Sequence, residues 1–266
     1  MDHHISSSSY HKHQSSYKRE RDDGGRNPCE SKRFRTNNHS RTLSTRKELY
    51  ERDFPVYKQP VEVGCFSLDS ERRFFNDSRQ MRYYVEPDRN PHFDLRDGYR
   101  DRFIKRDDSV KERLDHILRW MVASKSNTLD VDFVTWRGHL TKLLTTPYET
   151  KEGWLLAVTR FRGTFYISEV ETETARRERE NRTERHEEMM YWGYKFEQYT
   201  CADNAHSLPD PGGVVNTNEA FCTVVQTRLA DHRLLFSVYI TIVSQSLLVP
   251  CYDNNLNPQT VLCLFK

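Results

Sequence analysis

The sequence predicts an α+β domain, because strand-like and helix-like patterns occur together in one chain of 266 residues. Two strand-like runs, 154–161 and 164–170, flank Arg162-Gly163, which is a hairpin signal. A capping box, Ser109–Glu112, precedes apolar residues at helical spacing, which indicates the start of a helix. These patterns favour a hairpin-bearing sheet with helices packed on it.

The other elements are predicted from the same kinds of pattern. Residues 131–144 are predicted as a strand that contains Trp136. The charge-dense run 176–188 is predicted as a solvated helical face, and residues 189–196 as the buried end of the same helix. A second capping-box pattern at 216–219 precedes an apolar run to residue 229. We predict this run as a third amphipathic helix.

The first 53 residues are predicted to be disordered. Residues 1–50 hold 11 Lys or Arg against 6 Asp or Glu and few apolar side chains. Lys18-Arg19 and the basic cluster 32–35 have the spacing of a bipartite nuclear import signal, which predicts localisation in the nucleus. A solvated basic tail and non-specific contact with RNA are the alternatives.

Composition excludes several classes of protein. A net charge of +2 excludes a strongly basic nucleic-acid wrapper at the level of the whole chain. We expect no membrane span and no signal peptide, because the apolar run 238–249 is too short and residues 1–10 are polar. The six cysteines form no C-x-x-C pair, and the ten glycines form no phosphate-cradling loop.

Residues 136–138, Trp-Arg-Gly, are the first candidate site. An arginine at a strand end offers a planar fork that grips phosphate, and Trp136 offers a face for a base or ribose. The alternative is a buried strand tryptophan beside an Arg137 that is paired with a core carboxylate.

Glu197 is the second candidate, because a carboxylate flanked by aromatic residues needs a cation beside it. That cation could be a divalent metal or an arginine. Glu112 is explained equally well by the capping box, and Arg72 taken alone by an exposed surface position. Cys222, predicted to lie in the middle of a helix, is explained by a small buried apolar side chain.

Seven segments together resemble the decapping exoribonuclease family, the nuclear enzymes that remove aberrant and NAD caps from RNA 5′ ends. The similarity is collinear from residue 54 to residue 237. It is carried by Glu62–Asp69, Phe93–Tyr99, Glu112–His116, Val134–Tyr148, Gly193–Tyr199, Cys201–Asp203 and Val215–Cys222.

This resemblance implies a mixed β-sheet nuclease core related to restriction endonucleases. It implies a hydrolase dependent on Mg²⁺ or Mn²⁺ that acts on NAD-capped, incompletely capped and 5′-triphosphate RNA, with 5′→3′ exonuclease activity and a nuclear exoribonuclease as a candidate partner. It implies that Glu197 is catalytic and ligates the metal. The implied substrate-binding residues are Arg72, Glu112, Trp136, Arg137, Gly138 and Cys222.

The sequence departs from the family pattern after Ser237. Tyr239 and Thr241 stand where the resemblance leads us to expect carboxylates, and residues 238–266 contain two charged residues. We therefore predict an incomplete nuclease core over 54–237, truncated at its C-terminus, and an unrelated apolar tail over 238–266. Such a chain should bind divalent ions poorly and lack decapping activity. The alternative function is a non-catalytic form that binds RNA 5′ ends or a protein partner.

Overall fold

The computed structural model describes residues 40–124, 130–151, 153–240 and 243–244. The chain divides into two units, Met1–Thr42 and Leu43–Lys266. In the first unit the described residues are 40–42, all exposed, and the predicted import signal lies outside the described residues. The second unit contains the helices and strands named below, together with a short 3₁₀ turn, η1 (Lys47–Leu49).

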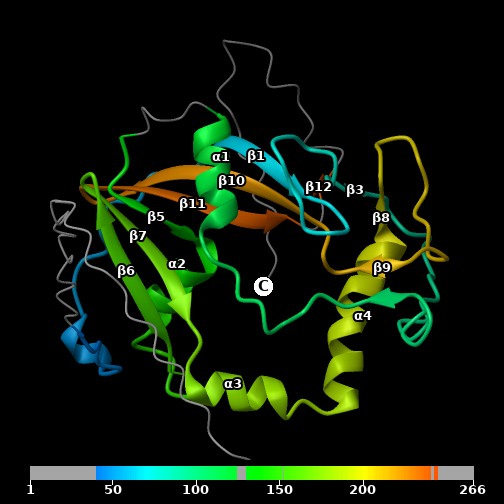
Figure 1. Ribbon diagram of the computed structural model, residues 1–266, viewed down its shortest axis with the longest axis horizontal. Helices are drawn as coiled ribbons and strands as arrows, with labels where there is room; N and C mark the ends of the chain where they lie inside the picture. The colour runs from blue at the N-terminus through cyan, green and yellow to red at the C-terminus, as the bar shows by residue number, and fades with distance from the viewer. Residues whose placement is uncertain (1–39, 125–129, 152, 241–242, 245–266) are drawn as a thin grey trace, which may run out of the picture. The chain divides into compact units, whose positions relative to one another are not determined.

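A seven-stranded mixed sheet organises the second unit, with the strand order β2-β1-β10-β11-β5-β7-β6 (Figure 1). Its strands are β1 (Val61–Leu68), β2 (Phe74–Phe75), β5 (Phe133–Trp136), β6 (Leu155–Phe161), β7 (Thr164–Val170), β10 (Ala220–Leu229) and β11 (His232–Ile240). Strand β5 is parallel to both of its neighbours, β11 and β7, and the remaining pairs are antiparallel.

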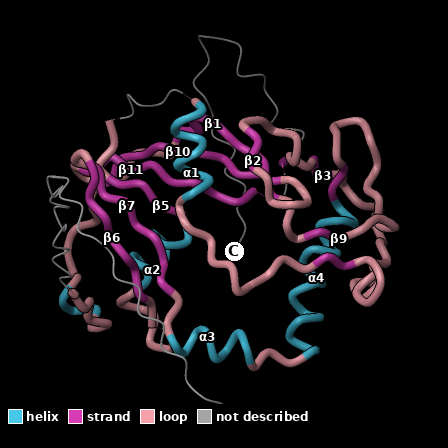
Figure 2. The backbone as a smooth tube through the Cα atoms, viewed as in Figure 1, coloured by secondary structure: helices cyan, strands magenta, loops and turns pink. Residues whose placement is uncertain are grey.

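Four helices accompany this sheet: α1 (Asp115–Ala123), α2 (Arg137–Thr145), α3 (Glu173–Glu180) and α4 (Glu184–Thr200). Figure 2 shows α1 lying across the sheet and α3 joining the end of β7 to α4. Beside α4 lie two small sheets, β12-β3-β8 and β4-β9. Their strands are β3 (Tyr83–Tyr84), β4 (Phe103–Ile104), β8 (Cys201–Ala202), β9 (Val215–Asn216) and β12 (Val243–Ser244).

The core lies between α1 and the middle of the large sheet. Ile117 and Trp120 of α1 pack against Phe66 of β1 and Val224 of β10, and all four are buried. Gly64 allows this close approach, because a Cβ atom there would lie 2.6 Å from Trp120 Cζ2. The glycine also falls where the β1–β10 register shifts.

The predicted α+β class and the predicted hairpin are confirmed. Strands β6 and β7 pair antiparallel from Leu155↔Val170 to Phe161↔Thr164. Arg162 and Gly163 at the turn both have positive φ, 49° and 91°. Such a two-residue turn matches the twist of the flanking strands.

The predicted third helix is wrong, because residues 220–229 form strand β10. Residues 221–224 of this strand are all buried, so side chains that point to opposite faces of the sheet, such as Phe221 and Cys222, are both covered. Burial on both faces removes the alternating signal of a half-exposed strand, and the apolar residues then mimic helical spacing. Threonine and valine at 223–225 and 227 favour the extended backbone.

Two other element boundaries also differ from the prediction. The strand predicted over 131–144 ends at Trp136, and α2 takes over with the helix-favouring residues Arg, Leu and Lys. The predicted charged helix is two helices, since Thr183 begins α4 by accepting a hydrogen bond from the His186 N–H.

The predicted capping box is wrong as well. Helix α1 begins at Asp115, after Glu112, and Ser109 bonds to Asp107 instead of to a helix N–H. Glu112 is therefore free for other contacts.

Strand β11 continues past Ser237, the residue at which we predicted the family core to end. Val238, Tyr239 and Ile240 pair with residues 221–223 of β10 in unbroken register. Val243-Ser244 then pairs with β3. Thr241 and residues 245–266 of the predicted tail lie outside the described residues.

We predict that Gly64→Ala destabilises the protein by about 1–3 kcal/mol, because the added methyl group forces Trp120 and α1 away from the sheet. Gly193→Ala is the matched control. Nothing lies within 4 Å of a Cβ at that helical position, so its stability should stay equal or rise. Urea unfolding of both variants measures the difference, and equal stabilities would contradict the packing described for Trp120.

Candidate functional site

A pocket of about 490 Å³ opens where four segments of the second unit meet. The segments are the 106–112 loop, the β5–α2 junction, the stretch from the end of β7 through α3, and the end of β11. The pocket is lined by Trp136, Arg137 and Gly138, which are the first site predicted from the sequence, and also by Glu112. Four of the six predicted substrate residues thus line one pocket, although Glu112 is distant in the chain from the other three.

The β5–α2 junction provides an anion site on the wall of this pocket. Trp136 is the last residue of β5, and α2 begins at Arg137 without a side-chain hydrogen bond to cap it. The first N–H groups of α2 are therefore available, and the helix dipole adds positive potential there. Gly138 leaves the approach open, with nothing within 4 Å of a Cβ position.

Arg137 differs from the other cations of the pocket wall. Its side chain is exposed and has no ion pair or hydrogen bond among the described residues. The other lining Lys and Arg side chains each have a carboxylate partner. The pairs are Arg106–Glu112, Lys111–Glu171, Lys142–Glu169, Arg179–Glu171 and Arg182–Asp108. The alternative in which Arg137 is paired with a core carboxylate is therefore not observed.

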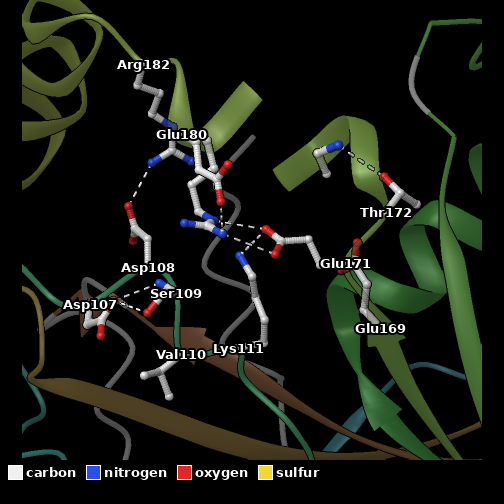
Figure 3. Close-up of polar contacts among 12 residues, drawn as sticks. Asp107, Asp108, Ser109, Val110, Lys111, Glu169, Glu171, Thr172, Glu180 and Arg182 are labelled. Atoms are coloured by element: carbon white, nitrogen blue, oxygen red, sulfur yellow. Dashed lines mark hydrogen bonds and ion pairs between the residues drawn. The ribbon is translucent and has the colours of Figure 1, made fainter. Parts of the chain in front are cut away.

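On the α3 side of the pocket, two ion pairs link residues that flank α3 to the 106–112 loop (Figure 3). Lys111 Nζ lies 2.7 Å from Glu171 Oε1, and Arg182 Nη1 lies 2.8 Å from Asp108 Oδ2. Arg179 and Lys111 lower the pKa of Glu171 to about 2. This carboxylate stays ionised at neutral pH and keeps both cations occupied.

Arg72 and Glu112 form a second cluster next to the pocket. Arg72 follows β1 in a turn closed by its own N–H bond to the Asp69 carbonyl, and its φ is 61°. Its guanidinium donates to Glu112, to the Asn218 carbonyl at 3.1 Å and to the Tyr239 hydroxyl at 2.9 Å. Two arginines, Arg72 and Arg106, thus neutralise Glu112.

Tyr239 completes the pocket wall, and its role was not predicted from sequence. Its ring stacks on Trp136 with centroids 5.0 Å apart and planes 2° apart. The parallel β11–β5 register places Ser237 beside Trp136, so Tyr239 lies two residues further along, beyond the point where β5 ends. The stack depends on this long-range pairing, which no local pattern reveals.

Cys222 lies behind this wall. It is fully buried in β10, directly opposite Tyr239 in the β10–β11 register, and it does not line the pocket. Burial raises the pKa of its thiol far above the ordinary value, so it stays protonated. Its observed environment is that of a small buried apolar side chain.

Glu197 lies on α4, away from this pocket's lining. Burial raises the pKa of Glu197 to about 7, although Arg82 nearby acts in the opposite direction. Arg82 forms its ion pairs with Glu219 and Asp203, and the Glu197 carboxylate has no hydrogen bond or ion pair among the described residues. An arginine is therefore close enough to act on the Glu197 carboxylate, but it forms no ion pair with it.

The neighbouring Lys195 anchors this turn of α4. It is fully buried, and its ammonium donates to Asp97 at 3.0 Å, to Gln198 at 3.0 Å and to the Pro211 carbonyl at 2.6 Å. These bonds anchor α4 to two loops and hold Glu197 in its partly buried position.

The described residues do not fit a divalent metal. Within residues 40–124, 130–151, 153–240 and 243–244, no three His, Cys, Asp or Glu side chains are placed to hold an ion. Glu197 is alone, and Glu112 is bound by two guanidinium groups. Magnesium and manganese need several oxygen ligands from carboxylates and water.

The fold is a mixed central sheet with flanking helices, and the pocket opens where β5 ends and α2 begins. Residues 58–243 match the model of the family described as "RAI1 like PD-(D/E)XK nuclease". The chain belongs to this RAI1-like family of decapping nucleases.

Individual relatives agree with this assignment. The chain is 55% identical over 205 residues to the bovine decapping and exoribonuclease protein, covering 74% of this chain and 52% of the relative. It is 37% identical over 191 residues to the Neurospora crassa decapping nuclease RAI1, covering 65% and 44%. The chain thus spans about half the length of the curated relatives it matches.

Solved structures show the same fold. The Scheffersomyces stipitis Rai1 complex with (3'-NADP)⁺ and calcium has a TM-score of 0.65 at 23% identity, covering 77% of this chain and 60% of the other. The Candida albicans Rai1 complex with pU5-Mn²⁺ has a TM-score of 0.63 at 24% identity, covering 70% and 55%.

Among the described residues, no helix has the length and apolar character needed to cross a membrane.

The elevated pKa of Glu197 predicts a stability that falls with rising pH. The folded state binds the proton more tightly than the unfolded chain, so the contribution of Glu197 to stability is greatest below pH 4.5 and is lost as the pH rises through about 7. Glu197→Gln should remove this decline and stabilise the protein at pH 8 by roughly 2 kcal/mol.

Urea unfolding at pH 5 and pH 8 measures this effect. Glu178→Gln, an exposed substitution on α3, is the control that should leave the pH dependence unchanged. If Glu197→Gln also unfolds with the wild-type pH dependence, the carboxylate is not desolvated in the folded protein.

Proposed function

We propose that this chain binds the phosphorylated 5′ end of RNA in the pocket at the β5–α2 junction. The observation that carries the proposal is Arg137, a cation without a partner among the described residues, at the uncapped N-terminus of α2. A terminal phosphate would receive the α2 N–H groups, the helix dipole and the guanidinium fork together. Trp136 and Tyr239 provide aromatic surface beside it.

Family membership extends the proposal to the reaction. Relatives carry the names decapping nuclease and decapping and exoribonuclease protein. For this chain the proposed substrates are NAD-capped, incompletely capped and 5′-triphosphate RNA, with hydrolysis dependent on Mg²⁺ or Mn²⁺ and followed by 5′→3′ degradation. A metal supplied to such a site would activate a water molecule and neutralise the leaving oxygen.

We further propose that hydrolysis by this chain is impaired. The carboxylates of the described residues do not assemble a metal site, and the one beside the pocket, Glu112, is already neutralised by Arg72 and Arg106. Non-catalytic binding of RNA 5′ ends is the second candidate function. Binding needs the anion site alone, whereas turnover needs the metal as well.

Arg137→Ala should weaken binding of a 5′-phosphorylated RNA pentamer roughly 10-fold, because a charge-assisted contact with phosphate is lost. Arg119→Ala removes an exposed arginine outside the pocket and should bind as wild type does. Fluorescence anisotropy at fixed salt measures both. Equal affinities of the two variants would contradict the proposed anion site.

The same RNA ends decide between turnover and binding. We expect the purified chain to bind NAD-capped and 5′-triphosphate RNA but to release little product with 1 mM Mg²⁺ or Mn²⁺, roughly the range in which weakly held divalent ions bind proteins. Robust cleavage that requires the metal would overturn the proposal of impairment and leave the binding proposal standing.

Nuclear localisation and an exoribonuclease partner are further proposals, supported by the basic clusters at 18–19 and 32–35 and by family membership. A fluorescent fusion of the full chain should accumulate in nuclei, and alanine at Lys18, Arg19 and residues 32, 33 and 35 should abolish this accumulation. The same fusion with Arg41 and Arg46 replaced is the control. Nuclear accumulation that survives the cluster substitutions would exclude the signal.

A further inference from the structure

The aromatic pair at the end of β11 has two unequal sides. Trp136 is 6% exposed and lies beneath Tyr239, and its indole N–H is already used by the Arg113 carbonyl at 3.0 Å. Tyr239 covers it and is 41% exposed, with its open surface lining the pocket. The aromatic surface that a ligand meets is therefore that of Tyr239.

We infer that Tyr239 is a base-stacking platform that selects the first nucleotide of a 5′-phosphorylated RNA and holds it without a divalent ion. The base stacks on the open face of Tyr239, and the 5′ phosphate binds Arg137 and the start of α2. This inference rests on the proposed function and names the residue by which the pocket recognises its ligand.

The topology places the two halves of this subsite side by side. Because β5 and β11 run parallel and Ser237 pairs with Trp136, both strands point their C-terminal ends to the same edge. There β5 turns into α2 and presents Arg137, while β11 continues and presents Tyr239. Both residues line one pocket, and about 490 Å³ is within the range of small-ligand sites.

The Tyr239 ring is held before any ligand arrives. Its hydroxyl accepts a hydrogen bond from Arg72 Nη2 at 2.9 Å and is also hydrogen-bonded to Glu112. Arg72 is itself fixed by the Asn218 carbonyl and by Glu112. A ring fixed at its hydroxyl end and along one face loses little freedom on binding, which favours stacking of a base on the other face.

The charges also explain why no divalent ion is required. The carboxylate nearest to Tyr239, Glu112, is neutralised by arginines, so it neither repels the ligand phosphate nor needs a metal to offset it. The positive charge that the phosphate needs comes from Arg137 and the α2 dipole.

A double-mutant cycle between Tyr239 and the 5′ base tests the inference on the full chain. Two fluorescent RNA pentamers are used, both 5′-phosphorylated, one complete and one lacking its first base. Binding is measured in EDTA for wild type, Tyr239→Ala and Tyr239→Phe. Tyr148→Ala is the control, since Tyr148 is 79% exposed and lies outside the pocket lining.

We expect Tyr239→Ala to weaken binding of the complete RNA by about 5- to 100-fold, the range of one base–aromatic stack. Wild type should lose a similar factor on the abasic RNA, and Tyr239→Ala should lose nothing more on it. Tyr239→Phe keeps the ring and should stay within roughly threefold of wild type, since one hydrogen bond is lost. Thermal melting checks that each variant is folded. The comparison of the two RNAs on wild type tests recognition of the base even if a variant fails to fold.

Other outcomes overturn the inference. If Tyr239→Ala weakens both RNAs equally, the ring does not contact the base. If it raises affinity, the ring blocks the pocket instead of serving it. If wild type binds in manganese but not in EDTA, the subsite depends on a metal. If Arg137→Ala loses binding but Tyr239 shows no coupling to the first base, the platform alone is overturned. If wild type does not bind the RNA at all, the proposed function and the platform are overturned together.

Discussion

The parallel pairing of β11 with β5 is the constraint on which the site depends. Four residue pairs, from Leu234↔Phe133 to Ser237↔Trp136, set the register, and β10 holds the other edge of β11 along its full length. Because successive strand side chains alternate between faces, a slip of one residue would turn Tyr239 away from Trp136. The same pairing brings the start of α2 beside the turn after β1 that carries Arg72.

Charge pairing is the second constraint, and it divides the acidic side chains of the site into two groups. Glu112 is held by Arg72 and Arg106, because a partly buried carboxylate is tolerated when cations and donors surround it. Glu197 has no ion pair or hydrogen bond among the described residues, and burial outweighs the opposing effect of Arg82 and raises its pKa to about 7. A divalent ion at Glu112 would have to displace two guanidinium groups, and at Glu197 it would find a single carboxylate.

The parts of this molecule that local patterns determine were predictable. The β6–β7 hairpin follows from a two-residue turn between apolar runs, and the strand that ends at Trp136 follows from the apolar residues before it. The substrate roles of Trp136 and Arg137 stay predictions. Strand β10 was not predictable, because burial on both faces of the sheet gives its apolar residues a spacing that looks helical. The metal role implied for Glu197 and the substrate role implied for Cys222 stay predictions.

The other features that could not be predicted depend on contacts between segments that are distant in the sequence. Arg72 and Glu112 are 40 residues apart, and the capping box offered Glu112 a local explanation that the structure replaces with an ion pair. Tyr239 was noted only for the carboxylate it replaces. Its ring stacks on Trp136, and its hydroxyl bonds to Arg72, which is 167 residues away in the chain. Such contacts form only when the register of the whole sheet is set.

The distribution of paired and unpaired cations supports the proposal that this nearly neutral chain binds the end of an RNA in preference to its interior. A protein that tracks the backbone of a nucleic acid needs a row of free cations to neutralise successive phosphates. In the described part of this pocket wall the row is present but already paired, through Glu169, Glu171, Asp108 and Glu112. What is left is Arg137 with a helix N-terminus, a single point of positive potential. One such point suits a terminal phosphate, which carries more charge and more free oxygens than an internal one, and an aromatic face beside it suits the base attached to that phosphate.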